Sequence, residues 1–188
     1  MNSQLVRIPA DEVHIEGLLE LPAEAQGIVL FAHGSGSSRH SPRNNYVARV
    51  LHDKGFGTLL LDLLTLAEDL DYQTRSLPIA YFGASTGAAA ALQAAAALGR
   101  EIHAIVSRGG RPDLAGTHDL TKVMTPTLLL VGSRDEEVLE LNRAAYSRLP
   151  CTKKLSLIAG ATHLFEEAGA LEDVADQTAA WFSQYLTA

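Results

Sequence analysis

Cysteine is nearly absent from this sequence of 188 residues, which holds Cys151 alone. One cysteine excludes an internal disulfide, and such scarcity is typical of a reducing compartment, so we expect a cytoplasmic protein. Cys151 follows Pro150 at a predicted helix-to-strand turn, which favours a packing role over a reactive thiol.

Long apolar runs and basic clusters are also missing. No run approaches the roughly 20 residues that a membrane-spanning helix needs, and residues 1–10 lack the basic start and apolar stretch of a secretory signal. Lys and Arg number 15 against 22 Asp and Glu, for a formal net charge of -7. Because binding to a phosphate backbone needs clustered cations, we expect neither nucleic acid nor a membrane as a partner.

The residues that are present have the balance of a globular protein, with 47% hydrophobic and 20% charged side chains. A chain of this length and composition can bury one sizeable core. We therefore predict that residues 1–188 form a single domain that is ordered nearly end to end.

Predicted strands and helices alternate along the chain. Two extended segments, residues 6–9 and 13–21, predict an antiparallel pair at one edge of a sheet. Short, almost wholly apolar runs are typical of parallel strands covered on both faces, and they occupy residues 28–32, 58–63, 78–82, 102–106, 127–131 and 155–158. Helical spacing of apolar residues marks residues 42–54, 86–98, 136–149 and 172–186. The alternation predicts an α/β fold with a mostly parallel, doubly wound sheet, which binds ligands beyond the carboxyl ends of its strands.

The strongest local motif is Gly-Ala-Ser-Thr-Gly at residues 83–87, with Ser85 at its centre. It lies between a predicted strand and a predicted helix, where a sharp turn would lift a serine hydroxyl above the sheet. The flanking glycines avoid clashes in so tight a bend. We predict that Ser85 is a nucleophile; a glycine-rich turn without a catalytic role is the alternative.

A serine nucleophile needs a base and an acid, which follow it in the order Asp or Glu, then His, where this turn is catalytic. Asp135 and His163 each come just beyond a predicted strand, on the same edge of the sheet as Ser85. We predict that His163 removes the serine proton and that Asp135 fixes the tautomer of the imidazole. A helix N-cap is the alternative for Asp135, with Glu136 as the reserve acid, and a structural loop histidine is the alternative for His163.

A second glycine-rich segment, His-Gly-Ser-Gly-Ser at residues 33–37, directly follows the first predicted parallel strand. Acyl transfer needs two backbone N–H groups aimed at the developing oxyanion. We predict that Ser35 supplies one and Thr86 the other, with Gly34 and Gly36 lining the substrate site. A glycine turn that only leads into the next helix is the alternative. Neither glycine-rich segment completes a dinucleotide or P-loop fingerprint.

Two arginines follow another predicted strand, in Ser-Arg-Gly-Gly-Arg at residues 107–111. A guanidinium at that edge could hold a substrate carboxylate through two hydrogen bonds, and we assign this role to Arg108, with Arg111 as the second candidate. A solvated or structural arginine is the alternative. We expect neither a metal nor a cofactor.

Taken together, these motifs resemble the dienelactone hydrolase-like branch of the α/β-hydrolases, with matches at residues 30–38, 81–90, 129–135 and 160–166. The resemblance covers most of the chain. It implies an α/β-hydrolase fold and a serine hydrolase of carboxylic esters, namely short acyl esters, lactones or thioesters. Relatives often carry a lid after the strand at residues 102–106, but this chain has no long insertion there, so we expect no large lid. Dienelactone hydrolase itself uses a cysteine nucleophile, whereas this chain has Ser85, so we do not carry over its lactone substrate.

One stretch departs from that family, which usually places a full helix before the strand that leads to the nucleophile. Here only residues 64–77 remain, which is near the minimum for a parallel crossover and leaves room for one or two helical turns at most. We expect an open, shallow site. The shortened crossover leaves open a homodimer contact at the place of the missing helix, and also an engineered or trimmed origin.

Two other functions use the same residues. A non-catalytic binding module could have inherited the fold, although an intact Ser85, Asp135 and His163 set argues against it. An acyltransferase or perhydrolase would share the triad and differ only in the second nucleophile, so the sequence does not separate it from a hydrolase.

Overall fold

The structure, a computed structural model, describes residues 3–10, 13–62 and 77–186. Within these residues eight strands form one sheet, in the order β1-β2-β4-β3-β5-β6-β7-β8. β2 pairs antiparallel with β1 and with β4, and the remaining neighbours are parallel. This confirms the predicted mostly parallel sheet with an antiparallel N-terminal edge. The strands are β1 (Gln4–Ala10), β2 (Val13–Glu20), β3 (Ile28–Ala32), β4 (Gly57–Leu61), β5 (Ile79–Ala84), β6 (Ile102–Arg108), β7 (Thr127–Gly132) and β8 (Lys153–Ile158).

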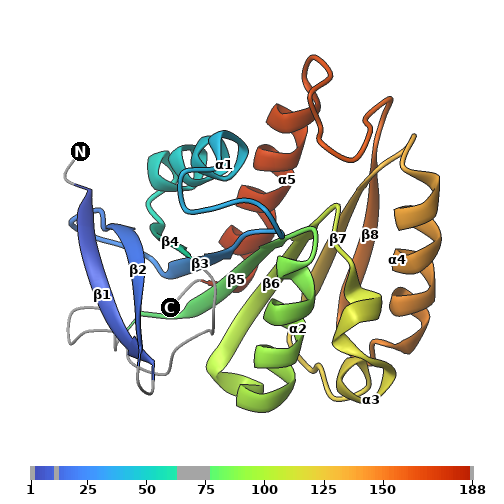
Figure 1. Cartoon of the computed structure of the whole chain (residues 1–188), viewed down its shortest axis with the longest axis horizontal. Coiled ribbons are helices and arrows are strands. Elements are labelled where there is room, and N and C mark those ends of the chain that lie inside the picture. The colour runs from blue at the N-terminus through green and yellow to red at the C-terminus, as the bar shows by residue number, and fades with distance from the viewer. Residues whose placement is uncertain (1–2, 11–12, 63–76, 187–188) are drawn as a thin grey trace.

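Helices cover both faces of the sheet (Figure 1). α1 (Pro42–Asp53) and α5 (Ala170–Tyr185) pack together on one face. The other face carries α2 (Gly87–Leu98), the short α3 (Thr117–Leu120) and α4 (Glu136–Arg148). The sequence did not predict α3 or the 3-10 helices η1 (Gly99–Glu101) and η2 (Pro112–Ala115), because they are too short for a periodic apolar pattern.

The core has two layers, one on each face of the sheet. All five residues of β3 are buried, and they alternate between the layers. Val29 and Phe31 join the cluster beneath α1 and α5, whereas Ile28 and Leu30 join the cluster beneath α2 and α4. This two-sided burial explains why the central strands are continuous apolar runs.

The connections that leave β3 and β5 run in opposite directions along the sheet. β3 lies between β4 and β5, so its own crossover leads to β4 while the crossover from β5 leads away to β6. In an open α/β sheet, the crevice beyond such a switch point is where ligands bind. The loops after β3 and β5 border this crevice.

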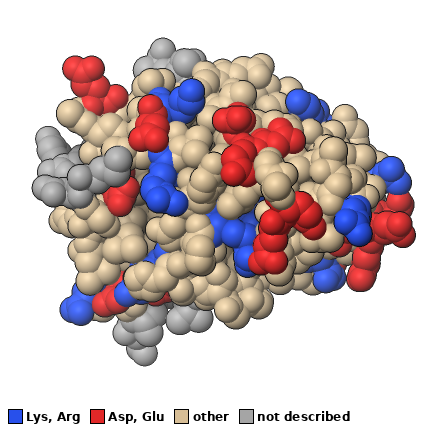
Figure 2. Space-filling view, turned by 90° about the horizontal axis from the view of Figure 1, so that it is seen from above, with Lys and Arg blue, Asp and Glu red and all other residues tan. Residues whose placement is uncertain are grey.

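Other features predicted for the surface have mixed outcomes. The shortened crossover at residues 64–77 lies outside the described residues, apart from its last one. Between β6 and β7 the chain forms only η2 and α3, in keeping with the absence of a large lid. Among the described helices, none is long and apolar enough to cross a membrane. Basic and acidic side chains are interspersed on the face that bears the β8–α5 loop (Figure 2).

Candidate active site

The turn between β5 and α2 holds Ser85 in a left-handed backbone conformation, with φ of 52°. This region is unfavourable for a residue with a side chain and persists only where the surroundings enforce it. Two backbone hydrogen bonds do so here: Ser85 N–H donates to Arg108 O at 3.1 Å, and Arg111 N–H donates to Ser85 O at 3.0 Å. The loop after β6 therefore braces the serine turn.

Close packing leaves no room for a side chain at the glycines on either side of the turn. A Cβ added at Gly83 would lie 2.4 Å from Ala88 Cα. A Cβ at Gly87 would lie 2.2 Å from the backbone oxygen of Ala32, at the end of β3. The motif spacing thus allows α2 to begin directly against the neighbouring strand.

Asp135 and His163 meet across the loops after β7 and β8. His163 Nδ1 lies 2.7 Å from Asp135 Oδ2. Because a carboxylate can only accept, this contact assigns the proton to Nδ1 and leaves Nε2 as the acceptor. Asp135 does stand at the N-cap position of α4, but its side chain makes no capping hydrogen bond. Glu136, the reserve acid, is an exposed residue at the start of α4.

Ser85 and His163 line one pocket of about 250 Å³. Gly34, Ser35 and Arg108 line it too, whereas Gly36 is not among its lining residues. Within the described residues no hydrogen bond joins Ser85 to His163. Such bonds are often long in unliganded enzymes and tighten when substrate binds.

The two residues predicted for the oxyanion hole contact each other. Ser35 N–H donates to Thr86 Oγ1 at 2.9 Å, and the Ser35 hydroxyl lies 3.1 Å from the same oxygen. Gly34 is pressed against the nucleophile, because a Cβ there would lie 2.9 Å from Ser85 Cβ. The predicted role of Ser35 therefore requires the Thr86 side chain to turn and release this amide.

Arg108 is a buried cation in this pocket, only 8% exposed. Its Nη2 donates to Asn44 Oδ1 at 3.4 Å, and its guanidinium lies 5.6 Å from the centre of the Phe165 ring. Burial, followed by repulsion from Arg43, lowers the pKa of Arg108 to about 10. Among the described residues no carboxylate forms an ion pair with it, and its Nε is buried without a hydrogen-bond partner.

Arg111, the second arginine of the motif, has a different environment. Its guanidinium binds Asp113 through two hydrogen bonds of 2.9 and 2.8 Å. This contact raises the pKa of Arg111 and lowers that of Asp113. The structural alternative therefore describes Arg111.

The carboxylate of Glu167 stabilises the loop that carries His163. Glu167 Oε1 accepts hydrogen bonds from Thr162 N–H at 3.1 Å and from Thr162 Oγ1 at 2.7 Å, and the hydroxyl contact is the main reason that the pKa of Glu167 is lowered. Phe165, in the same loop, is buried with φ of 56°. These contacts set the position of the histidine.

Sequence reasoning missed half of the pocket wall. Leu164 adds one lining residue from beside His163. The β3–α1 loop and the first turn of α1 add four more, namely Ser37, Ser41, Arg43 and Asn44. The signal was available, because residues 42–54 were predicted to begin a helix at the same edge of the sheet. The pattern of residues 42–54 predicted a helix but no residue of the site.

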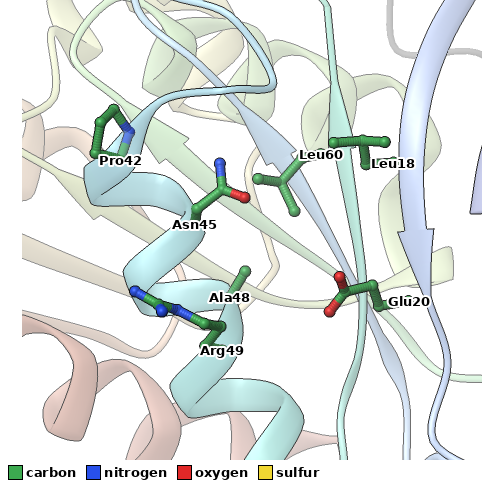
Figure 3. Close-up of a pocket in the computed structure, with 7 residues that line it drawn as sticks. All are labelled: Leu18, Glu20, Pro42, Asn45, Ala48, Arg49 and Leu60. Atoms are coloured by element: carbon green, nitrogen blue, oxygen red, sulfur yellow. The ribbon is translucent and has the colours of Figure 1, made fainter. Parts of the chain in front are cut away.

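A second cavity of about 370 Å³ lies between α1 and the strands β2 and β4 (Figure 3). Its lining includes the charged Glu20 and Arg49 and the apolar Leu18, Ala48 and Leu60, and none of the predicted site residues. Within the described residues no group of three or more potential ligands could hold a metal ion.

Comparison with known proteins places this architecture among characterised folds, although no protein-family model matches the chain. The crystal structure of a dienelactone hydrolase from Anabaena variabilis is 44% identical, with a TM-score of 0.93 over 98% of each chain. Est1E from Butyrivibrio proteoclasticus is 20% identical, with a TM-score of 0.82 over 97% of this chain and 98% of that one. At that identity, the likeness shows a shared fold alone.

Two curated relatives from Mycobacterium tuberculosis bear the name "Putative phosphoribosyl transferase". They are 48% identical to this chain over 210 residues, which include 99% of this chain but only 47% of the relatives. The chain thus spans about half the length of these proteins. Since the matched stretch exceeds the 188 residues of this chain, the relatives contain residues within it that this chain lacks.

Proposed function

Since the chain belongs to the dienelactone hydrolase-like branch of the α/β-hydrolases, we propose that it hydrolyses carboxylic esters through an acyl-enzyme on Ser85. The observation that carries the proposal is the 2.7 Å contact between Asp135 and His163, because His163 lines the same pocket as Ser85, which lies on a strained turn. A nucleophile, a base and an orienting acid are the parts that this reaction needs.

In the proposed reaction, Ser85 Oγ attacks the carbonyl carbon while His163 Nε2 takes the hydroxyl proton. The tetrahedral intermediate collapses when His163 delivers that proton to the leaving oxygen, which releases an alcohol and leaves the acyl group on Ser85. A water molecule then attacks the acyl carbon, again with His163 as base, and the acid departs. Asp135 stabilises the imidazolium that forms twice in this cycle.

The oxyanion of each tetrahedral intermediate would accept hydrogen bonds from the backbone N–H groups of Ser35 and Thr86. The Thr86 hydroxyl must first leave the Ser35 amide, as described above. A pocket of about 250 Å³ supports small acyl esters, lactones or thioesters as the substrate class. Acyl transfer or perhydrolysis would use the same groups with another second nucleophile.

The name of the mycobacterial relatives refers to proteins about twice as long as the matched stretch. We assign the phosphoribosyl transfer in that name to the part of those proteins outside the match. This chain is accordingly expected to release no pyrophosphate from phosphoribosyl pyrophosphate in a coupled assay.

The test of ester hydrolysis is turnover of p-nitrophenyl acetate, butyrate and octanoate by the wild type and by Ser85→Ala. We expect faster turnover of the two shorter esters and a loss of roughly 10⁴-fold or more in Ser85→Ala. Ser147→Ala, which changes a serine on the outside of α4, is the matched control and should retain full activity. Equal rates in all three proteins would exclude Ser85 as nucleophile, and no turnover at all would favour a binding module.

A further inference from the structure

Arg108 has a charge that the described part of the protein does not balance. A buried cation is costly unless it is paired, and its contacts here are an amide oxygen at 3.4 Å and the Phe165 ring. Two such weak partners offset little of this cost, because the guanidinium has five N–H donors and, among the described residues, one of them makes a hydrogen bond. The pocket beside Ser85 is the open side of this group.

A second arginine faces the same space. Arg43, the second residue of α1, lines the pocket and lies close enough to Arg108 to lower its pKa. Its partner is Glu166, at 3.1 Å, whose side chain is 65% exposed. Exposed pairs of this kind contribute little, so Arg43 can exchange this carboxylate for an anion in the pocket.

The backbone at this place also favours an anion. The loop after β3 is rich in glycine and serine and leads directly into the first turn of α1, a helix of 12 residues. In this first turn Pro42 has no N–H and the Asn44 N–H donates to the Ser41 hydroxyl at 3.4 Å, so the Arg43 N–H remains for an anion, and the helix dipole favours negative charge there. Three serine hydroxyls, those of Ser35, Ser37 and Ser41, belong to residues that line the pocket, and among the described residues that line it none is acidic.

We propose that the ester substrate carries a phosphate group, which Arg108, Arg43 and the N-terminal turn of α1 bind beside Ser85. This specificity rests on the proposed ester hydrolysis, because the phosphate would hold the acyl carbonyl near the nucleophile. A phosphate presents three acceptor oxygens and a charge near −2, which matches two guanidiniums on separate elements. A carboxylate has one charge and two oxygens, so the two arginines would share a single negative charge.

The experiment compares three p-nitrophenyl esters whose acyl chains end in a phosphonate, a carboxylate or a methyl group: 3-phosphonopropanoate, hemisuccinate and pentanoate. Rates are corrected for uncatalysed hydrolysis. For the wild type we expect kcat/KM for the phosphonate ester to exceed that for pentanoate by at least about tenfold, and to exceed that for hemisuccinate.

The variants are Arg108→Gln and Arg43→Gln, with Arg143→Gln as the matched control. Arg143 is likewise an arginine paired with a glutamate on a helix surface, but it lies on α4 and does not line the pocket. Each pocket variant should lower the ratio of phosphonate to pentanoate kcat/KM by at least about tenfold, and Arg143→Gln should leave this ratio unchanged. If Arg108→Gln does not fold, as judged by circular dichroism, Arg43→Gln decides.

Calorimetric titration of phenyl phosphate and benzoate separates this proposal from ester hydrolysis itself. Phenyl phosphate should bind the wild type and Ser85→Ala more tightly than benzoate does, and should bind Arg108→Gln or Arg43→Gln at least about tenfold more weakly. That result would support the phosphate site even if no ester were hydrolysed. Equal kcat/KM for the phosphonate and pentanoate esters, a preference for hemisuccinate, or unchanged phenyl phosphate affinity in both variants would overturn the proposal.

Discussion

At the scale of single residues, the nucleophile turn follows from a short motif read in context. The five-residue motif Gly-Ala-Ser-Thr-Gly is a weak pattern by itself. Its position between an apolar strand and an alanine-rich helix is what predicts a nucleophile turn. The positive φ of Ser85 and the tight contacts at Gly83 and Gly87 fit the turn that this context predicted.

The turn gives a first prediction, the effect of Gly87→Ala. The added methyl group would meet the end of β3, so the strand and the loop with Ser35 must move. We expect a loss of about 1–3 kcal/mol in the free energy of unfolding, measured in urea, and a decrease of at least tenfold in kcat for p-nitrophenyl acetate. Gln93→Ala, on the exposed side of α2, is the control and should change neither quantity.

The acid was less certain from sequence, because Asp135 also fits an N-cap and Glu136 adjoins it. Only the folded loops show that the Asp135 side chain contacts His163 and leaves the cap unbonded. Similarly, no sequence pattern reveals that Thr86 Oγ1 binds the Ser35 amide, since this contact joins loops from two strands.

A second prediction concerns Asp135→Asn. An asparagine that keeps the contact with Nδ1 can donate to it, which would place the ring proton on Nε2, where Ser85 needs an acceptor. We expect kcat to fall by about 10³-fold or more while the melting temperature stays within a few degrees of the wild type. Glu136→Gln, one residue further on, should retain nearly full activity. The reverse pattern of losses would assign the acid to Glu136.

At the scale of elements, the apolar runs and helical spacing predicted the central strands and the four long helices within a few residues. β5 and β6 extend further than predicted, to Ala84 and Arg108, and so end directly at the site. The short α3, η1 and η2 gave no periodic signal. The first turn of α1 shows the limit of this approach, because the pattern predicted the helix but not the pocket that its side chains line.

A third prediction concerns the β8–α5 loop and its pH dependence. The Thr162 contacts hold the pKa of Glu167 below its usual range, so its stabilising effect is complete above the usual glutamate pKa and is lost as the pH falls through the lowered value. Glu167→Gln should therefore lower the melting temperature at pH 7, and the difference from the wild type should shrink towards zero on acidification below about pH 4.

The same substitution should lower kcat several-fold at pH 7, because the loop positions His163. Glu24→Gln changes an exposed carboxylate in the turn before β3 and provides the control. A melting-temperature difference that stays constant from pH 7 to pH 3 would contradict the proposed role of the carboxylate.

At the scale of the whole molecule, alternation of strands and helices predicted a doubly wound sheet but not its strand order. The order depends on which crossover passes over which face, and this is decided by packing between distant segments. The strand order places β3 beside β5, and β5 beside β6. These neighbours bring together the glycine-rich loop after β3, Ser85 after β5 and Arg108 at the end of β6. The resemblance to a known family supplied the chemistry that the topology alone would not.

The central claim is that Ser85 becomes covalently acylated, and labelling with a fluorophosphonate tests it most directly. Intact-mass and peptide mass spectrometry of the wild type should show one adduct, on the peptide containing Ser85, with much slower labelling in His163→Ala and none at this position in Ser85→Ala. An adduct on another residue, or an unmodified wild type under conditions that label a serine esterase, would contradict the account.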